Sequence, residues 1–521
     1  MNASICRLEI LPAQNGRTRL RKSLFRATLN PPKEGAPVSS LPFPKRGLPR
    51  DEVLASMRAA RDHDLQWQRG RVFGLVYHVN DEIDDLLKEA SNLFFSENGL
   101  NPTAFPSLRK FETEIVAMTA SLLGGDASAA GNITSGGTES LLCAVKTARD
   151  WARINRPEVG APEILMPVTA HPAFEKAAEY FDLRVVKTPV RADFRADVEA
   201  TRAAITPNTI LMIGSAPSYP HGVVDPIREL AALAQERGIL FHVDACVGGF
   251  VLPFVKKLGY EIPDFDFSVA GVTSISADLH KYGYAAKGAS VILYKSAALR
   301  RHQMFVSTDW PGGIYPSPTM AGTRPAGPIA AAWAILNFLG EEGYLELNRQ
   351  VMETVKHLQA GIRAIPGLKI LSNPEMSVFA LASDSLDVYQ IADELSLRGW
   401  HLDRQQFPAC LHMTVNFVHT EAADEFLRDL AACADAVRRP TLQKTATRLL
   451  VQAANALARI LPEAWVSRLM SRASALLNGG GGGGLPSRMA PMYGLIGSLP
   501  NRGDLKELVL DLLDSMTRLN Q

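Results

Sequence analysis

Short apolar runs alternate with helix-length segments between residues 106 and 330, and this alternation restricts the possible fold more than any other feature. The runs with the length and composition of buried strands are Glu163–Val168, Arg184–Thr188, Thr209–Gly214, Leu240–Val243 and Ser290–Tyr294. Amphipathic segments such as Glu139–Ile154 and Pro226–Arg237 separate them. The alternation predicts an α/β fold with a mostly parallel sheet covered by helices. In such sheets, ligands bind at the carboxyl ends of the strands.

The rest of the chain has a different pattern. Residues 1–105 are predicted to form an N-terminal arm and a helical segment, and residues 106–335 the large domain. A long helix, then short strands and further helices, predict a smaller α+β domain over residues 336–521. The segments expected in it are a helix at Ala331–Gly361, strands near Lys369–Leu371, Val378–Ala382 and His412–Val418, and a last helix at Leu505–Leu519. The glycine run 479–484 predicts a flexible loop before that last helix.

Charge and cysteine content exclude several classes of function. Lys plus Arg number 55 and Asp plus Glu 54, so no global field favours nucleic acid or an anionic membrane. The five cysteines include no Cys-x-x-Cys pair, which favours a reducing compartment over a disulfide framework. The basic N-terminus has no apolar stretch behind it, and no run reaches the ~18 apolar residues of a spanning helix. We therefore expect a cytoplasmic protein without a transmembrane segment.

A lysine and an aspartate follow two of the strand-like segments. Ser274–Tyr284 contains the pair His280-Lys281, and the run that begins at Leu240 ends on Asp244. A lysine that attacks an aldehyde needs an accessible, neutral amine, and ligand sites lie where such strands end. A buried aspartate needs a cation, such as a protonated ring nitrogen. Taken singly, each has a plainer interpretation, a surface His-Lys pair and an aspartate that caps the next helix.

Two further motifs precede these in the chain. Thr134–Ser140 contains two glycines before a helix, where close backbone approach and free N–H groups suit an anion such as a phosphate. A helix cap with a tight turn explains that motif equally well on its own. His171 follows the strand-like run ending at Val168 and could stack on a planar ring, or simply begin the next helix.

As a set, these motifs resemble the fold-type-I pyridoxal-phosphate enzymes, within the group that joins the group II amino-acid decarboxylases to the sphingosine-1-phosphate lyases. Further segments resemble the lyase branch: Ala104–Glu112, Ala216–Gly222, Tyr282–Gly288 and Met492–Gly494. The resemblance covers about residues 60–521. It implies an α/β large domain with a mostly parallel sheet, a smaller α+β C-terminal domain, and pyridoxal 5'-phosphate as cofactor.

The resemblance also implies roles for individual residues at the cofactor. Lys281 would carry the cofactor as a Schiff base, Asp244 would pair with the pyridine nitrogen, and His171 would stack on the ring. The residues implied at or near the cofactor phosphate are Gly136, Gly137, Thr138, Ser276 and His280.

Other matched positions concern the substrate and a second subunit. Tyr77, Tyr219 and Lys287 match positions that the lyases use around the substrate and are implied to be catalytic. Gly322 and Thr323 match a loop that reaches the partner subunit's cofactor. The resemblance therefore implies a homodimer with shared active sites.

The implied reaction cleaves the C2–C3 bond of a phosphorylated long-chain amine, giving a fatty aldehyde and phosphoethanolamine. The base that takes the C3 hydroxyl proton stays open among Lys281, Lys287, Tyr219 and the cofactor phosphate. The alternative activity is that of a group II decarboxylase acting on glutamate or an aromatic amino acid, and a third is that of a catalytically inactive binding protein. One departure from the lyases is Asn101, which stands where many of them have a histidine.

Overall fold

The computed structural model describes residues 43–62 and 64–439, Ala490, and residues 506, 507, 509, 510, 513 and 514. The chain divides into two compact units, and the larger, Leu48–Val466 with Ser487–Arg502, contains all the elements named below. Most of the predicted arm, the glycine run 479–484, the Met492–Gly494 run and much of the predicted last helix lie outside the described residues. The predicted domain boundaries remain a prediction.

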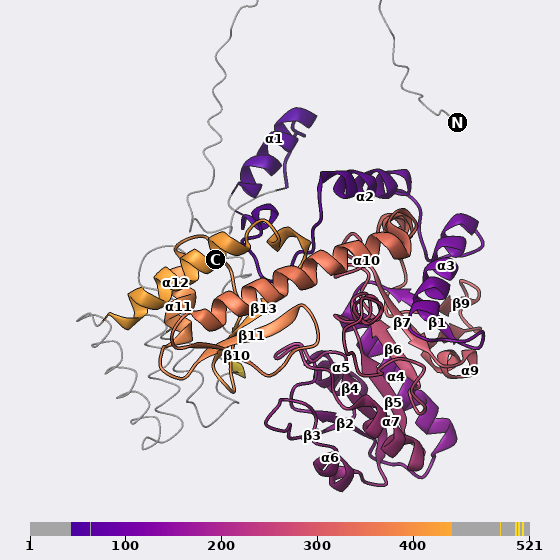
Figure 1. Ribbon diagram of the computed structural model, residues 1–521. Helices are drawn as coiled ribbons and strands as arrows, with labels where there is room; N and C mark the ends of the chain where they lie inside the picture. Colours follow the sequence, from indigo (N-terminus) through magenta and orange to yellow (C-terminus); the bar gives the residue numbers. More distant parts are fainter. Residues whose placement is uncertain are drawn as a thin grey trace, which may run out of the picture. The chain divides into compact units, whose positions relative to one another are not determined.

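A seven-stranded sheet forms the centre of the larger unit, in the order β1-β7-β6-β5-β4-β2-β3 (Figure 1). Its strands are β1 (Ala130–Thr134), β2 (Glu163–Pro167), β3 (Arg184–Thr188), β4 (Thr209–Ser215), β5 (Leu240–Asp244), β6 (Ser274–Ala277) and β7 (Ser290–Tyr294). Only β7 runs against the direction of the other six strands, so the predicted mostly parallel sheet is confirmed. The five predicted runs agree with these strands to within one residue at each end. The run that forms β1 was not predicted, since its glycine and asparagine are uncommon in strands.

Helices cover the sheet on both faces, as expected for parallel strands joined by crossovers. The helices of the larger unit are α1 (Arg50–Arg61), α2 (Asp81–Leu93), α3 (Pro106–Leu122), α4 (Gly137–Asn155), α5 (Ala173–Phe181), α6 (Val198–Ala204), α7 (Ile227–Glu236), α8 (Leu252–Lys257), α9 (Ala297–Arg300), α10 (Ala326–Ala364), α11 (Val388–Ser396) and α12 (Ala423–Arg438). Of these, α1 buries no residue, and α11 packs against α12 and against β13 (Cys410–Thr414) of a second, smaller sheet. The predicted helix Ala331–Gly361 lies within α10, which packs against α2 and α3 and is kinked at Gly340. No helix among the described residues combines the length and the apolar character that crossing a membrane requires.

A second, antiparallel sheet follows α10 in the order β10-β11-β13-β12. Its strands are β10 (Leu368–Leu371), β11 (Val378–Ser383), β12 (Arg404–Gln405) and β13 (Cys410–Thr414), and a separate hairpin joins β8 (Phe305–Ser307) to β9 (Tyr315–Ser317). The predicted strand His412–Val418 is too long. The Asn416 side chain accepts a hydrogen bond from the Val418 N–H and begins a short 3-10 turn, Phe417–His419, which ends the extended backbone.

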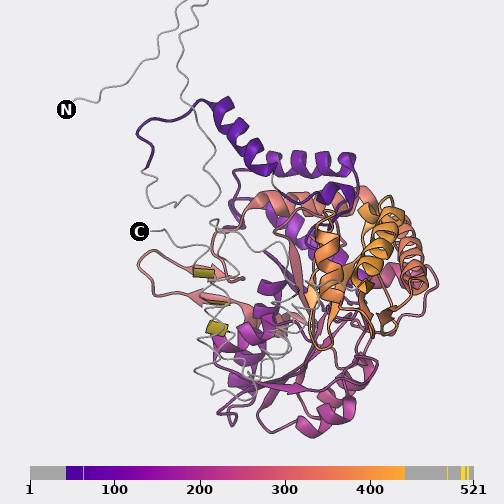
Figure 2. The ribbon, with the colours of Figure 1, turned by 90° about the vertical axis from the view of Figure 1, so that its left-hand side faces the viewer.

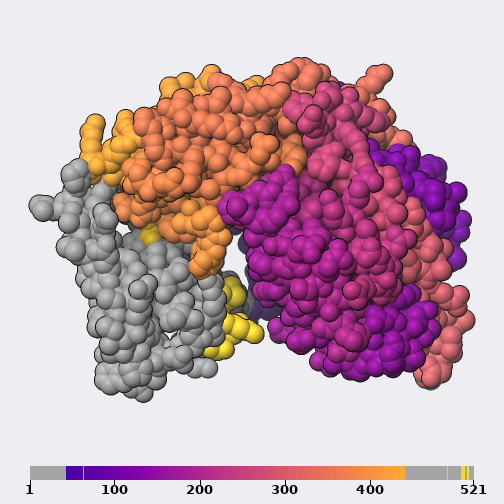
Figure 3. All heavy atoms as spheres, turned by 60° about the horizontal axis from the view of Figure 1, so that its bottom comes forward, coloured from indigo at the N-terminus to yellow at the C-terminus, as the bar shows by residue number. Residues whose placement is uncertain are grey.

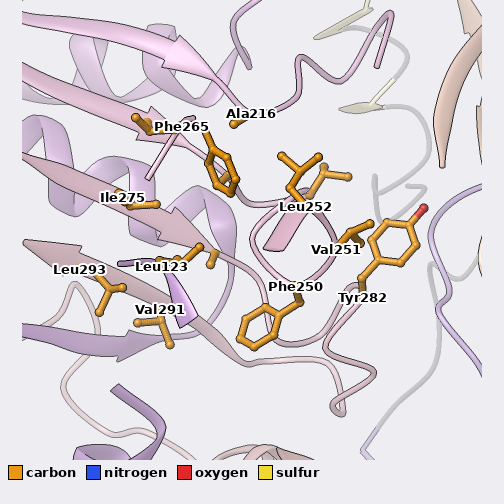
Figure 4. Close-up of a cluster of buried hydrophobic side chains, with 14 of the residues drawn as sticks. Leu123, Ala216, Phe250, Val251, Leu252, Phe265, Ile275, Tyr282, Val291 and Leu293 are labelled. Atoms are coloured by element: carbon orange, nitrogen blue, oxygen red, sulfur yellow. The ribbon is translucent and has the colours of Figure 1, made fainter. Parts of the chain in front are cut away.

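Buried apolar side chains fix the large sheet against its helices. Figure 4 shows part of this core, in which Phe250, Ile275 and Val291 are at most 2% exposed. The Tyr282 ring packs into the same cluster, while its hydroxyl points away and donates to the Val415 carbonyl at 2.7 Å. That bond links the large sheet's loops to the small sheet, and residues of the two regions lie directly against each other in Figure 3.

Candidate active site

The carboxyl ends of β1, β2, β4, β5 and β6 meet at one edge of the large sheet, because these strands run parallel. Asp244 is the last residue of β5 and lies in register with Ser276 of β6. Lys281 follows β6, and Gly136 follows β1. The parallel topology therefore brings together motifs that lie about 145 residues apart in the sequence.

Lys281 forms an ion pair with a carboxylate that the sequence motif contains but that we did not single out. Its Nζ lies 2.9 Å from Oδ2 of Asp278, which is almost fully buried. Burial alone would lower the pKa of Lys281, but the charge of Asp278, together with its hydrogen bond and the neighbouring Cys246 and Tyr77, outweighs burial and raises the pKa. For Asp278, burial works to raise the pKa, and the charges of Lys281 and His280 turn the net shift downward.

A chain of buried hydroxyls holds Asp278 from its other side. Ser290 Oγ donates to Asp278 Oδ1 at 2.6 Å, Ser290 and Ser140 share a hydrogen bond of 2.8 Å, and Ser140 and Thr134 share one of 2.7 Å. These residues come from β7, α4 and β1, so the lysine's ion-pair partner is fixed by three elements. The signal that identifies Asp278 is its position three residues before the lysine, directly after a buried strand.

Gly136 and Gly137, at the start of α4, lie against His280 and Asp278. A Cβ atom on Gly137 would stand 2.8 Å from Asp278 Oδ2 and 3.0 Å from Cys246 Sγ, so a larger residue does not fit. A Cβ on Gly136 would meet the His280 ring at 3.3 Å. The helix begins at Gly137 without a side-chain cap, which leaves the first N–H groups, including that of Thr138, to an anion.

Asp244 is 8% exposed, and neighbouring groups orient its carboxylate. Its Oδ1 accepts from the Cys246 N–H at 3.1 Å and from Ser276 Oγ at 3.4 Å. Ser276 thus contacts Asp244, and its implied place near the cofactor phosphate remains a prediction. His242 contacts Ser276 from behind at 3.2 Å, and burial lowers the pKa of His242 to about 4, so the ring is neutral.

Two histidines, His280 after β6 and His171 after β2, follow strands that end at this edge. Burial lowers the pKa of His280 more than the Asp278 charge raises it, and its Nδ1 accepts from the Ala289 N–H at 3.3 Å. His171 follows β2, is exposed, and accepts from the Ala173 N–H through Nδ1 at 3.1 Å. Two hydroxyls at the ends of neighbouring strands, Thr169 and Ser218, are buried without a hydrogen-bond partner among the described residues. Such hydroxyls suit a polar ligand at this edge.

Tyr77 and Lys287 lie together beside the lysine. Lys287 Nζ donates to the His280 carbonyl at 3.0 Å and lies 5.0 Å from the centre of the Tyr77 ring. Lys287 is exposed at the surface of its own chain, and partial desolvation of its amine, followed by the charge of Lys281, lowers its pKa to about 8. Burial raises the pKa of Tyr77 to about 12, with the Lys281 charge acting in the opposite direction.

Tyr219 is joined to the small sheet. Its hydroxyl donates to Asp403 Oδ2 at 3.0 Å, and its ring stacks on His412 at 3.9 Å between centres. Burial and the Asp403 charge raise the pKa of Tyr219. Sequence reasoning did not identify Asp403 or His412 as part of this group.

Gly322 and Thr323 are joined to a different segment. Asn98 Nδ2 donates to Thr323 Oγ1 at 3.4 Å, and the Asn98 carboxamide oxygen accepts from the Arg324 N–H at 3.2 Å. Asn101 nearby uses its side chain to accept from the Thr103 N–H at 2.9 Å in a local turn. Thr323 is thus bonded to the segment that carries Asn98, while Gly322 lies near the Tyr315 hydroxyl.

The fold and this edge define a pyridoxal-phosphate enzyme, and comparison with known proteins agrees. The pyridoxal-dependent decarboxylase conserved domain matches residues 59–382. The sphingosine-1-phosphate lyase of Arabidopsis thaliana is 42% identical over 481 residues, which are 91% of this chain and 80% of that protein. The lyase of Rattus norvegicus is 44% identical over 77% of this chain and 71% of its own length.

Solved structures give the same result. The sphingosine-1-phosphate lyase of Burkholderia pseudomallei superposes with a TM-score of 0.74 at 41% identity, over 79% of this chain and 95% of that chain. The chain belongs to the sphingosine-1-phosphate lyase family within the pyridoxal-dependent decarboxylases. The predicted fold class, enzyme class and cofactor, pyridoxal 5'-phosphate, are confirmed.

Proposed function

We propose that this enzyme cleaves the C2–C3 bond of long-chain base phosphates and releases a fatty aldehyde and phosphoethanolamine. The observation that carries the proposal is the meeting of Lys281, Asp244, Gly137 and Lys287 at one sheet edge, in a chain 42% identical to a sphingosine-1-phosphate lyase. The alternative, decarboxylation of an amino acid, needs the same lysine and aspartate but no cation for a substrate phosphate.

The residues present fit the cofactor. Bound pyridoxal 5'-phosphate supplies an aldehyde that condenses with amines and a ring that accepts an electron pair. Lys281 would hold it covalently, and Asp244 would pair with its ring nitrogen. The glycines 136 and 137 leave room for the phosphate at the start of α4, and His171 would cover the ring.

Lys287 and Tyr77 are proposed to receive the substrate phosphate. A phosphate monoester carries close to two negative charges at neutral pH, and the chain's net charge of +1 offers no general attraction. Lys287 supplies a local cation beside Lys281, and the protonated Tyr77 hydroxyl supplies a donor.

We propose a role for Tyr219 other than direct binding or proton transfer. Its hydroxyl proton is already donated to Asp403, so it is not free for the substrate phosphate. Its raised pKa also disfavours it as the base for the C3 hydroxyl. We propose that Tyr219 contributes its ring to the wall of the site, which leaves Lys281, Lys287 and the cofactor phosphate as bases.

A homodimer is proposed from exposed apolar surface in the larger unit. The β8–β9 hairpin, which extends from the body of this unit in Figure 2, exposes Phe305, Val306, Trp310 and Ile314 to between 56% and 73%. Helix α1 buries no residue within its own chain. Apolar area of this kind usually marks an interface. Gly322, close to the Tyr315 hydroxyl of the same hairpin, would reach the partner's cofactor.

A reducing compartment such as the cytoplasm is the proposed location. Its support is that the cysteines of the described residues, Cys143, Cys246, Cys410 and Cys433, are free thiols buried in the fold.

The proposal is tested with Lys281→Ala and Lys281→Arg. Purified enzyme with cofactor is incubated with a long-chain base phosphate, and phosphoethanolamine release and the visible cofactor absorbance are recorded. Both variants should lose turnover and the absorbance band, while Lys281→Arg keeps a cation beside Asp278 and so keeps its thermal stability. Normal turnover in either variant would refute the role of Lys281.

A further inference from the structure

Strands β5 and β6 carry polar side chains on one buried face of the large sheet. In their register His242 stands beside Ser274, and Asp244 stands beside Ser276. Because side chains alternate along a strand, these four point to the same face. His242 and Ser276 have no exposed surface, and Ser274 is 5% exposed. Polar groups buried this deeply are costly unless they bond to one another.

Hydrogen bonds join the four side chains in series. Ser274 Oγ lies 2.9 Å from His242 Nδ1, and His242 Nε2 lies 3.2 Å from Ser276 Oγ. Ser276 Oγ donates to Asp244 Oδ1 at 3.4 Å and accepts from Cys246 Sγ at 3.2 Å. Among the described residues, both hydrogen bonds to the Asp244 carboxylate end on Oδ1, the second coming from the Cys246 N–H. The other oxygen is thereby left for the cofactor's ring nitrogen.

The direction of each bond follows from the protons available. A hydroxyl donates one proton and can accept two hydrogen bonds, whereas a carboxylate only accepts. Ser276 gives its proton to Asp244, so the proton between Ser276 and His242 belongs to His242 Nε2. Burial lowers the pKa of His242 to about 4, and a neutral ring has one N–H, so Nδ1 accepts from the Ser274 hydroxyl. The opposite tautomer of His242 would take the Ser276 proton away from Asp244.

The consequence concerns the proton between Asp244 and the cofactor's ring nitrogen. A donor that bonds to a carboxylate stabilises its charged form over its protonated form. A charged Asp244 keeps the proton on the ring nitrogen, and the protonated ring is the form that accepts an electron pair readily. The Ser276 hydroxyl therefore supports the cofactor's chemistry only while His242 prevents it from turning away from Asp244.

We propose that His242 is a positioning residue for the cofactor: it holds the Ser276 hydroxyl on Asp244, and so keeps the ring nitrogen of pyridoxal 5'-phosphate protonated. His242 acts through these two residues and not on the substrate. The inference rests on the proposed pairing of Asp244 with the ring nitrogen, and it holds whichever substrate the enzyme takes.

Binding of two forms of the cofactor tests the inference. Protein freed of cofactor is titrated with pyridoxal 5'-phosphate and with the analogue that has a C–H group in place of the ring nitrogen, and dissociation constants are measured by absorbance. His242→Leu removes the donor to Ser276 at a similar side-chain volume. Loss of one neutral hydrogen bond predicts that the dissociation constant of the cofactor rises about two- to tenfold. That of the analogue should not change, because the analogue has no ring proton to hold.

Further variants show whether the effect passes through Ser276. His242→Gln keeps an N–H near the position of Nε2 and should restore the wild-type constant. Ser274→Ala removes only the donor to Nδ1, so it is the gentler change and should shift the constant in the same direction as His242→Leu. In the Ser276→Ala background, His242→Leu should have no further effect, because the hydroxyl that His242 orients is gone.

A matched control separates positioning from a general effect on folding. His419 is also fully buried, and its ring nitrogens lie 3.0 Å from the Val72 carbonyl oxygen and 3.0 Å from the Asn416 backbone nitrogen. His419→Leu should lower thermal stability, as His242→Leu does, and leave both dissociation constants unchanged.

Several results would overturn the inference. An equal rise for cofactor and analogue in His242→Leu would indicate a general distortion of the site. An unchanged cofactor constant in His242→Leu, no rescue by His242→Gln, or effects of His242→Leu and Ser276→Ala that multiply in the double variant would each refute it.

Asp244→Asn tests the underlying pairing separately. It should remove the preference of the site for the cofactor over the analogue. A preserved preference would refute the pairing proposed for Asp244, and the inference with it. If Asp244→Asn removes the preference while His242→Leu leaves it intact, the pairing stands and the inference alone fails.

Discussion

Replacing Lys287 with Arg should abolish an alkaline loss of substrate affinity that the wild-type enzyme displays. The pKa of Lys287 is lowered to about 8, first by desolvation and then by the charge of Lys281. Its protonated fraction therefore falls from about nine tenths at pH 7 to about one tenth at pH 9. The substrate phosphate stays doubly charged over this range, since its second pKa is about 6.

The size of the effect follows from these fractions. A charged hydrogen bond contributes about 1.5–3 kcal/mol, or about ten- to a hundredfold in affinity. KM for the phosphorylated base should then rise about tenfold between pH 7 and pH 9 in the wild type, because the fraction of protonated Lys287 falls about tenfold. An arginine keeps its charge throughout, so KM for Lys287→Arg should stay nearly flat.

The assay is steady-state kinetics with phosphorylated and dephosphorylated substrate across this pH range. Lys295 provides a matched control, because its Nζ also donates to a backbone carbonyl, that of Phe267 at 3.1 Å, and lies 5.4 Å from the centre of the Phe267 ring. Lys295→Ala should retain the wild-type profile, whereas Lys287→Ala should show a high KM at every pH. An alkaline rise of KM in Lys287→Arg equal to that in the wild type would refute the assignment.

Three further predictions follow from the geometry. Asp278→Asn removes a charge that raises the pKa of Lys281. When cofactor is added to cofactor-free protein, the pH at which the rate of appearance of the visible absorbance band is half-maximal should therefore move to lower pH; no shift, or a shift upward, would contradict this. Gly137→Ala should weaken cofactor binding by about 1–3 kcal/mol through its contact with Asp278, while Gly160→Ala, with open space around it, should not; equal cofactor dissociation constants would exclude the close fit. Trp310→Glu should give monomers in sedimentation velocity, and an unchanged dimer would remove the hairpin from the interface.

The candidate site residues that local pattern indicates, apart from the family resemblance, lie in motifs at strand ends. Lys281, Asp244 and the glycines before α4 each follow a run of recognisably buried residues, and parallel topology places such ends at one edge. Three motifs that are far apart in the sequence therefore indicate a single site. Asp278 was visible in the same motif, but nothing local distinguishes a buried ion-pair partner from a residue that caps a turn.

The small sheet's contribution could not be predicted from local pattern. His412 alternates with apolar residues on β13, as polar residues do in many strands, and only its stacking on Tyr219 relates it to the site. The hydroxyl of Tyr219, which the resemblance implied at the substrate, donates to Asp403, more than 180 residues later in the chain. Such a pair forms only when the large and small sheets pack against each other, and local sequence pattern does not predict that packing.

The most direct test of the proposed function is the fate of the substrate carbon. Cofactor-loaded enzyme is incubated separately with a long-chain base phosphate, with glutamate and with an aromatic amino acid, and fatty aldehyde and carbon dioxide are both quantified. A carbon–carbon lyase of the proposed kind releases aldehyde and phosphoethanolamine in equal amounts from the first substrate and no carbon dioxide from the others. Carbon dioxide release from an amino acid, with no aldehyde from the long-chain base phosphate, would contradict the account.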